Sequence, residues 1–227
     1  MPGQRDITLD SLRGVGILAV LIGHYGLPSP FEEFIYVWHM PLFFIVSGFL
    51  FKPKSNIKVI KNGFSRLIIP YLLTATIIAV VRFLSSGLNV LILRDGLISI
   101  LVASGSPNNP TCLSHYQVGA IWFLPALFWT QLFFNVVTNI FKRSGFRETI
   151  ITQALSCVAL SFISVIVGGI IYVPFDILQG ISAVVFFYTG YIFREYKLFD
   201  KPCDLFITLG GGSFSNIQCT FGNYGDV

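Results

Sequence analysis

Charged side chains are scarce in this sequence. Asp, Glu, Lys and Arg make up 11% of the 227 residues, whereas an average soluble domain carries about 25%. Hydrophobic residues reach 54%, and the mean hydropathy is +0.74. Because a water-soluble fold needs charge to cover its surface, this deficit excludes a soluble globular protein and indicates an integral membrane protein.

Cysteine pairs and clusters of metal ligands are also missing. No CxxC or CxxxC pattern joins the four cysteines, so the sequence supports neither a disulfide framework nor a zinc site. The three histidines, which are His24, His39 and His115, have no carboxylate or thiolate partner at ligand spacing. We therefore expect no metal, and we expect the cysteines to be packing residues.

The apolar runs are long and continuous rather than alternating, which predicts helices. A bilayer core of roughly 30 Å is crossed by about 20 mostly apolar residues in a helix. The first run has no cleavage site after it and is expected to be retained. We predict an all-α, polytopic transmembrane helix bundle with about six spans, at Leu12–Leu27, Phe34–Phe51, Leu67–Leu84, Ala120–Phe141, Ile150–Val173 and Ile177–Phe193.

The basic residues predict the orientation of these spans. With a cytoplasmic N-terminus, 13 of the 15 lysines and arginines fall on the cytoplasmic side, all but Arg82 and Arg94. This is a strong positive-inside pattern. The apolar stretch Leu88–Val102 is interrupted by Arg94 and Asp95, so we expect an interfacial or re-entrant segment there.

The pattern changes near the end of the chain. Residues 1–202 are expected to form the transmembrane domain, and residues 203–227 a polar, Gly-rich tail that is incomplete or disordered. The tail cannot form a full span, so the chain looks like the N-terminal part of a larger bundle.

Two polar side chains mark the first span. Arg13 and His24 are 11 residues apart, which is about 20° from three full helical turns, so they share a helix face about 16 Å apart along the axis. This spacing places Arg13 at the cytoplasmic mouth and His24 well inside, where an imidazole can act as a general base. Alternatively, Arg13 is a topology signal and His24 makes an interhelical hydrogen bond.

Two further segments carry polar groups. His39 follows Trp38 near the outer end of span two, on the same side as His24, and Gly48 permits the close approach of another helix. The alternative for His39 is interfacial packing. The basic loop Lys52–Arg66 contains five cations that suit phosphates, although topology or anionic lipid explains them equally well.

Read together, these segments resemble the acyltransferase 3 family of membrane proteins, which O-acetylate sugars and surface polysaccharides. The arginine and histidine of Leu9-Asp-Ser-Leu-Arg-Gly14 and Ile22-Gly-His-Tyr25 match its first-helix signature. The stretch from His39 to Leu50 resembles its second-helix motif, and Arg66-Leu-Ile-Ile-Pro-Tyr71 resembles the start of its third helix. Trp122-Phe-Leu124 and Gly190-Tyr-Ile-Phe-Arg194 are also in character.

The resemblance implies transfer of an acetyl group from cytoplasmic acetyl-CoA to a hydroxyl of a sugar, glycan or glycolipid, in a bacterial inner membrane. Membrane lipid is an expected partner and nucleic acid is not. His24 is then the catalytic base or acyl relay, assisted by Arg13, and the CoA phosphates are bound by Arg13, Arg66 and Lys61. Asp10 orients Arg13. The substrate-binding residues implied are His39, Asp10 and Trp122.

Two departures from the family pattern leave alternatives open. Many members carry two arginines three residues apart, but Gly63 stands three residues before Arg66, with Lys61 as the substitute cation. The family has about ten spans, which leaves an inactive fragment as one alternative. The other is a transporter or flippase for a glycolipid intermediate, which the lack of an internal repeat disfavours.

Overall fold

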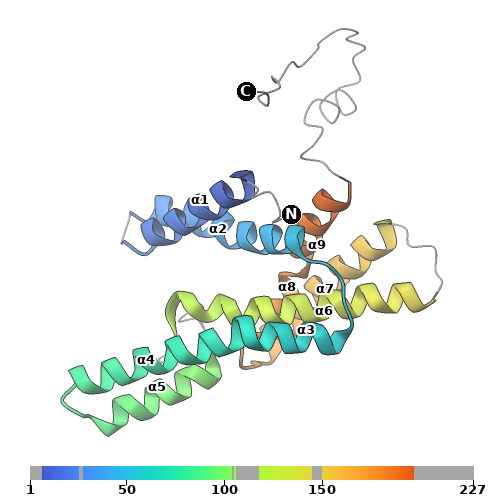
Figure 1. Ribbon diagram of the computed structural model, residues 1–227. Helices are drawn as coiled ribbons and strands as arrows, with labels where there is room; N and C mark the ends of the chain where they lie inside the picture. Colours follow the sequence, from blue (N-terminus) through green and yellow to red (C-terminus); the bar gives the residue numbers. More distant parts are fainter. Residues whose placement is uncertain (1–6, 26–27, 104, 106–117, 145–149, 197–227) are drawn as a thin grey trace, which may run out of the picture.

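The chain is seen in a computed structural model that describes residues 7–25, 28–103, 105, 118–144 and 150–196. Within these ranges the secondary structure is helical throughout, with no strand (Figure 1). The predicted all-α fold is therefore confirmed. His115, three of the four cysteines and the tail expected at 203–227 lie outside the described residues.

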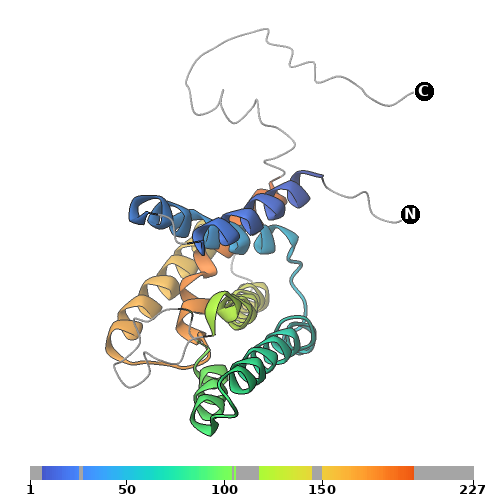
Figure 2. The same ribbon diagram turned by 90° about the vertical axis from the view of Figure 1, so that its left-hand side faces the viewer.

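Helices α1 (Ile7–Gly23) and α2 (Ser29–Leu50) form an antiparallel pair at one side of the bundle (Figure 2). Helix α1 has 17 residues, close to the shortest helix that crosses a bilayer. Helix α2 begins just after Pro28 and runs through Pro41, whose missing N–H removes one hydrogen bond from the helix interior.

The prediction of a basic loop at Lys52–Arg66 is wrong, because most of this segment is helical. Helix α3 (Asn56–Gly63), a π-helical turn η1 (Phe64–Ile68) and helix α4 (Ile69–Ser85) follow without a break. Val59 and Gly63 are buried, and α3 packs on α6, so the cations extend from one side of an amphipathic helix. The alternation of apolar and basic residues in the sequence of this segment is the pattern that indicates an amphipathic helix.

The π-helical turn has a local cause. Pro70 has no N–H to donate to the carbonyl of Arg66, so the regular ladder fails at this point. The N–H of Ile69 donates instead to the carbonyl of Phe64, five residues back. Such bulges recur at functional sites, and this one carries Arg66.

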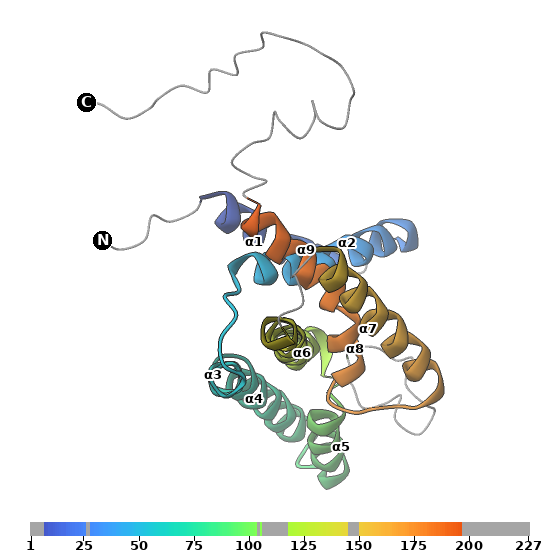
Figure 3. The same ribbon diagram turned by 90° about the vertical axis from the view of Figure 1, so that its right-hand side faces the viewer.

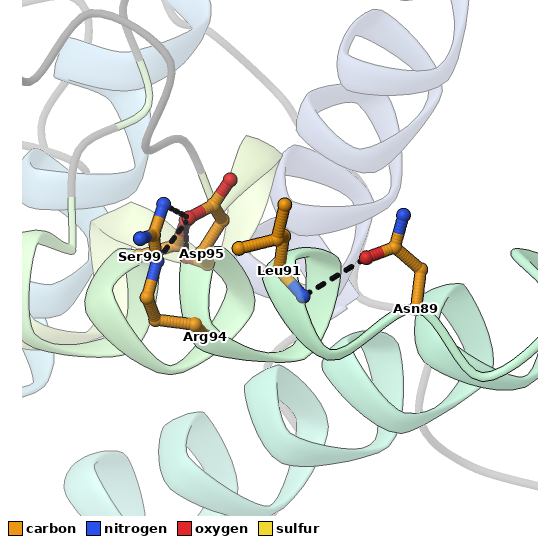
Figure 4. A network of polar contacts seen from close by, with 5 residues as sticks. All are labelled: Asn89, Leu91, Arg94, Asp95 and Ser99. Atoms are coloured by element: carbon orange, nitrogen blue, oxygen red, sulfur yellow. Dashed lines mark hydrogen bonds and ion pairs between the residues drawn. The ribbon is translucent and has the colours of Figure 1, made fainter.

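Helix α5 (Val90–Val102) folds back along α4 as a helical hairpin. Figure 4 shows its polar contacts: the Asn89 side chain caps the helix by accepting from the N–H of Leu91 at 2.9 Å, and Arg94 pairs with Asp95 at 2.9 Å. With 13 residues, α5 is too short for a regular span. Its expected interfacial or re-entrant placement stays a prediction.

Helix α6 (Phe123–Ser144), preceded by the 3-10 turn η2 (Gly119–Trp122), runs through the centre of the bundle. Figure 3 shows α6 end-on, with α3 and α4 on one side and α7 (Ile150–Ile170) and α8 (Ile177–Ser182) on the other. Helix α9 (Val184–Glu195) continues α8 after a single turn residue, Ala183, and packs against α2.

Glycine sets the closest helix crossing, between α2 and α9. A Cβ at Gly48 would overlap the carbonyl oxygen of Phe187, and one at Gly190 would overlap that of Ile45. The close approach expected at Gly48 is therefore confirmed. An aromatic core flanks the crossing, where Phe134 of α6 contacts Phe51, Phe187, Tyr188 and Tyr191.

Among the described residues, five helical segments are long and apolar enough to cross a membrane: Pro30–Leu50, Asn56–Ser85, Gly119–Phe141, Ile150–Ile170 and Ile177–Glu195. They expose much of their apolar surface; on α7, for example, Leu155 and Phe162 are 62% and 66% exposed. Because water disfavours such faces, they fit a hydrocarbon solvent. The chain is a multi-pass membrane protein. The first predicted span, Leu12–Leu27, overlaps α1, which is not among these five segments.

Candidate functional site

A cavity of about 780 Å³ lies among α1, α2, η2 and the start of α8. We call it the histidine cavity. Its walls are mostly apolar, and polar groups enter from several elements, namely His24, Glu32, Tyr36, His39, Asp176 and Gln179. A few convergent polar groups in an apolar cavity are typical of a ligand site.

His24 lies one residue beyond α1 and continues its hydrogen bonding, since its N–H donates to the carbonyl of Val20 at 3.1 Å. Its imidazole is exposed in the described part of the chain, and its expected depth in the membrane stays a prediction. The Nδ1 atom is hydrogen-bonded to the hydroxyl of Tyr36 on α2 at 3.0 Å. The interhelical bond of the alternative interpretation is therefore present, and Nε2 is the nitrogen that remains for a substrate.

The buried imidazole of the cavity is that of His39, which is 2% exposed. Its Nδ1 lies 2.7 Å from the carbonyl oxygen of Ile35. Because a carbonyl can only accept, Nδ1 carries the proton and Nε2 is left with a lone pair. The Tyr36 ring makes edge contacts with both imidazoles, and its centroid lies 5.7 Å from that of the His24 ring and 5.2 Å from that of the His39 ring. The three side chains therefore form one continuous polar wall.

Trp122 closes part of the same cavity from η2. A Cβ at Gly105 would collide with its indole ring, so the backbone at position 105 lies directly against the tryptophan. The structure thus brings together three of the side chains singled out from the sequence, His24, His39 and Trp122.

Asp176 enters the cavity from the connection between α7 and α8. It is 3% exposed, and its Oδ2 is buried without a hydrogen-bond partner among the described residues. Phe175 and Asp176 both have positive φ, of 65° and 51°, a conformation that costs free energy in residues other than glycine. Burial raises the pKa of the Asp176 carboxyl to about 8.

Hydrogen bonds to neighbouring elements hold this strained connection. The N–H of Phe175 donates to the carbonyl of Val102 at 3.1 Å, and the indole of Trp129 donates to the carbonyl of Phe175, also at 3.1 Å. The N–H of Gly180 donates to the carbonyl of Asp176 at 2.9 Å. The position of the carboxyl group is therefore set by α5, α6 and α8 together.

A second cavity, of about 320 Å³, lies where α2 ends and α3 begins. We call it the basic cavity. Three cations line it, Lys52, Lys54 and Arg66, and no carboxylate is among its described lining residues. This arrangement is suited to an anion. The π-helical turn at Arg66 is part of this wall.

The lysine-bearing segment is clamped by Asn135 of α6, which is fully buried. Its amide accepts from the N–H of Lys54 at 3.0 Å and donates to the carbonyl of Lys54 at 2.9 Å. It also donates to the Asn56 side chain at 2.7 Å. Asn139, one turn further along α6, donates to the same carbonyl oxygen of Lys54 and the same side-chain oxygen of Asn56, in bonds that are exposed.

The remaining residues singled out from the sequence lie apart from both cavities. Arg13 donates to Asp10 at 3.4 Å, so the expected one-turn pair is present on α1. Lys61 is exposed on α3 and does not line the basic cavity, where Lys52 and Lys54 accompany Arg66 instead. Within the described part of the chain, no three His, Cys, Asp or Glu side chains are grouped to hold a metal ion.

Sequence reasoning missed Tyr36, Asp176 and Asn135. Asp176 had a readable signal, since no other charged residue lies between Glu148 and Arg194, and isolated ionisable groups in apolar segments mark function. Tyr36 and Asn135 had no such signal. Their roles depend on which neighbouring helix they face.

Comparison with known proteins gives one family and a few distant relatives. A family model described as an acyltransferase domain matches residues 6–212. Nodulation protein NolL of Sinorhizobium fredii is 27% identical over 158 residues, which are 61% of this chain and 37% of that protein. NolL of Mesorhizobium japonicum is 27% identical over 166 residues, covering 62% and 38%. The chain thus spans less than half the length of these relatives, and no solved structure matches it.

Proposed function

The chain belongs to the acyltransferase 3 family, and from this membership we propose that it transfers an acetyl group from cytoplasmic acetyl-CoA to a hydroxyl of a sugar or surface glycan. The observation that carries the proposal is the pairing of a basic cavity with a histidine-lined cavity along one helix. Phe43 lines the histidine cavity and Ser47 lines the basic cavity, one turn apart on α2. The rise between them is only about 6 Å.

The basic cavity is proposed to hold the phosphates of acetyl-CoA. Lys52, Lys54 and Arg66 supply the charge there, and the positive-inside pattern assigns this end of the bundle to the cytoplasm. The long arm of CoA then runs past α2 and brings the thioester to the histidine cavity. Arg13 is proposed as a further contact to CoA, held by Asp10.

The chemistry proposed for the histidine cavity is a direct acyl transfer. Nε2 of His24 takes the proton of the acceptor hydroxyl while Tyr36 holds Nδ1. The acceptor oxygen bonds to the acyl carbonyl carbon, the carbon–sulfur bond breaks, and the proton passes to the sulfur to give free CoA. His39 binds the acceptor through its free Nε2, and Trp122 packs on the acceptor.

The acceptor and location are proposed on the same basis. The polar residues that α2 gives to the histidine cavity, Glu32, Tyr36 and His39, lie toward the start of α2, whereas the basic cavity lies at its end. An acceptor outside the cytoplasm is proposed to bind at the start of α2. A bacterial inner membrane is the location in which cytoplasmic acetyl-CoA and an external glycan meet across one bilayer.

The proposal is tested by measuring transfer of radiolabelled acetyl from acetyl-CoA to surface glycans, in membranes that contain this chain. Label is expected with the unmodified chain and is expected to be lost in His24→Ala, because the proton acceptor is removed. The matched control is Tyr25→Ala, since Tyr25 is the next residue and is 87% exposed. Full activity in His24→Ala would contradict the role of His24. No label from an inserted, unmodified chain would contradict the activity of this chain.

A further inference from the structure

The histidine cavity holds a polar group that the proposed transfer does not use. Asp176 comes from the α7–α8 connection, whereas the two histidines come from the end of α1 and from α2. Asp176 is 3% exposed, and its Oδ2 has no hydrogen-bond partner among the described residues.

A buried, unpartnered carboxyl oxygen is costly, and in native proteins such groups usually have an explanation. The cost adds to that of two consecutive positive φ angles, at Phe175 and Asp176. Three hydrogen bonds to surrounding elements maintain this arrangement, two between backbone groups and one donated by the Trp129 indole. The fold therefore holds the carboxyl group in place at the cavity, and no described residue supplies a hydrogen-bond partner to its Oδ2.

We infer that Asp176 is the acceptor-binding residue that selects a sugar hydroxyl, by accepting a hydrogen bond from it inside the histidine cavity. The inference rests on the proposed function for the identity of the acceptor. The apolar walls, which include Phe43 and Trp122, pack against the carbon-bound faces of a sugar ring. A hydroxyl satisfies Oδ2, whereas an apolar ligand leaves it unpartnered.

The ionisation of Asp176 agrees with a neutral ligand. Burial raises its pKa to about 8, so the carboxyl group is largely protonated at neutral pH. A protonated carboxyl can both accept from and donate to neighbouring hydroxyls. A sugar ring with adjacent hydroxyls can use both the donor and the acceptor of this carboxyl group. An anionic ligand does not require a group that does both.

The test measures sugar binding directly, with the full chain in lipid nanodiscs and saturation-transfer NMR. The probe is methyl α-L-fucopyranoside, chosen only as a small neutral sugar with adjacent free hydroxyls, and its fully O-methylated ether is a matched probe that cannot donate a hydrogen bond. Asp176→Leu is the test variant and Asp176→Asn a milder one. Asp95→Asn is the control, because Asp95 is an exposed carboxylate on α5 outside the cavity.

The parent chain and Asp95→Asn are expected to bind the fucoside, with binding in Asp176→Leu weaker by about tenfold or more. The O-methylated ether is expected to bind poorly to all variants. Equal binding of the fucoside by the parent and Asp176→Leu, with both proteins folded by their melting temperatures, would overturn the inference. So would an absence of fucoside binding by the parent.

A parallel measurement of thiol release from acetyl-CoA separates this inference from the proposed function. Fucoside binding that depends on Asp176, without thiol release, supports the site and contradicts acyl transfer by this chain. Thiol release without any Asp176-dependent binding supports the enzyme and overturns the inference. Failure of both readouts in a folded chain overturns both.

Discussion

At the scale of single residues, the two imidazoles of the histidine cavity lie in different environments. His24 is exposed at the rim, and His39 is buried with its protonated nitrogen fixed by the Ile35 carbonyl. The Nε2 of the exposed imidazole is accessible to a substrate hydroxyl, which suits a general base. The buried one presents a fixed acceptor, which suits binding. Tyr36 contacts both and couples their positions.

Asp176 is expected to make stability depend on pH. Its carboxyl has an ordinary pKa of 3.8 in the unfolded chain and a pKa of about 8 when folded. The folded state therefore binds the extra proton between these values, so stability is greatest below about pH 4 and is lost as the pH rises toward 8. Asp176→Asn removes this titration, and its stability should exceed that of the parent at pH 8 by on the order of a few kcal/mol.

Thermal unfolding of the two proteins between pH 5 and pH 8.5 checks this expectation, with Asp95→Asn as the control. The melting temperature of the parent should fall more steeply with pH than that of Asp176→Asn. Parallel pH profiles for the two proteins would show that burial does not hold the proton on Asp176.

At the scale of helices, the crossing of α2 and α9 depends on glycine. Gly48→Ala places a methyl group against the backbone carbonyl of Phe187, which cannot move as a side-chain end can. We expect a loss of about 1–3 kcal/mol, the usual cost of overpacking. Gly169→Ala on α7 is the control, because a Cβ there meets nothing within 4 Å. Denaturation of each variant in detergent, followed by helicity, measures the difference. Equal loss in both variants would show that the crossing is not the cause.

The clamp between α6 and the lysine-bearing segment links helix packing to donor binding. Asn135→Leu removes both hydrogen bonds to the Lys54 backbone and frees the segment that lines the basic cavity. The KM for acetyl-CoA should rise by about tenfold, with kcat changed less. Asn139→Leu is the matched control, since Asn139 shares two oxygens with Asn135 but does not accept from the N–H of Lys54. A fall in kcat at unchanged KM would argue against donor binding at this cavity.

At the scale of the whole molecule, the basic and histidine cavities lie toward opposite ends of α2, so orientation in the membrane decides which substrate meets which cavity. Arg194, which is ion-paired with Glu195, lies at the same end of α2 as the basic cavity, where its guanidinium donates to the carbonyls of Phe49 and Phe51. A cation is favourable at a helix C-terminus.

Single cysteines test the orientation in a background with the natural cysteines replaced by serine. Lys54→Cys should react with an impermeant thiol reagent only when the cytoplasmic face is accessible. Glu33→Cys, before the middle of α2, should react from the outer face of intact cells. Glu33 and Lys54 are both charged positions close to helix ends, so each variant is the control for the other. Reversed labelling would place the basic cavity outside and contradict use of cytoplasmic acetyl-CoA.

The sequence by itself determined the membrane setting, the helical fold and the family, because hydrophobic length and the order of short motifs are local properties. It also indicated His24, His39 and Trp122, which the fold gathers at one cavity. The tertiary structure alone decided that Lys52 and Lys54, rather than Lys61, share a cavity with Arg66. It also decided that Asp176 shares a cavity with the histidines and that Asn135 clamps Lys54. The Lys54–Asn135 contact joins residues 81 positions apart, and the residues that meet at the histidine cavity also come from distant parts of the chain. Both depend on helix packing that no local pattern records.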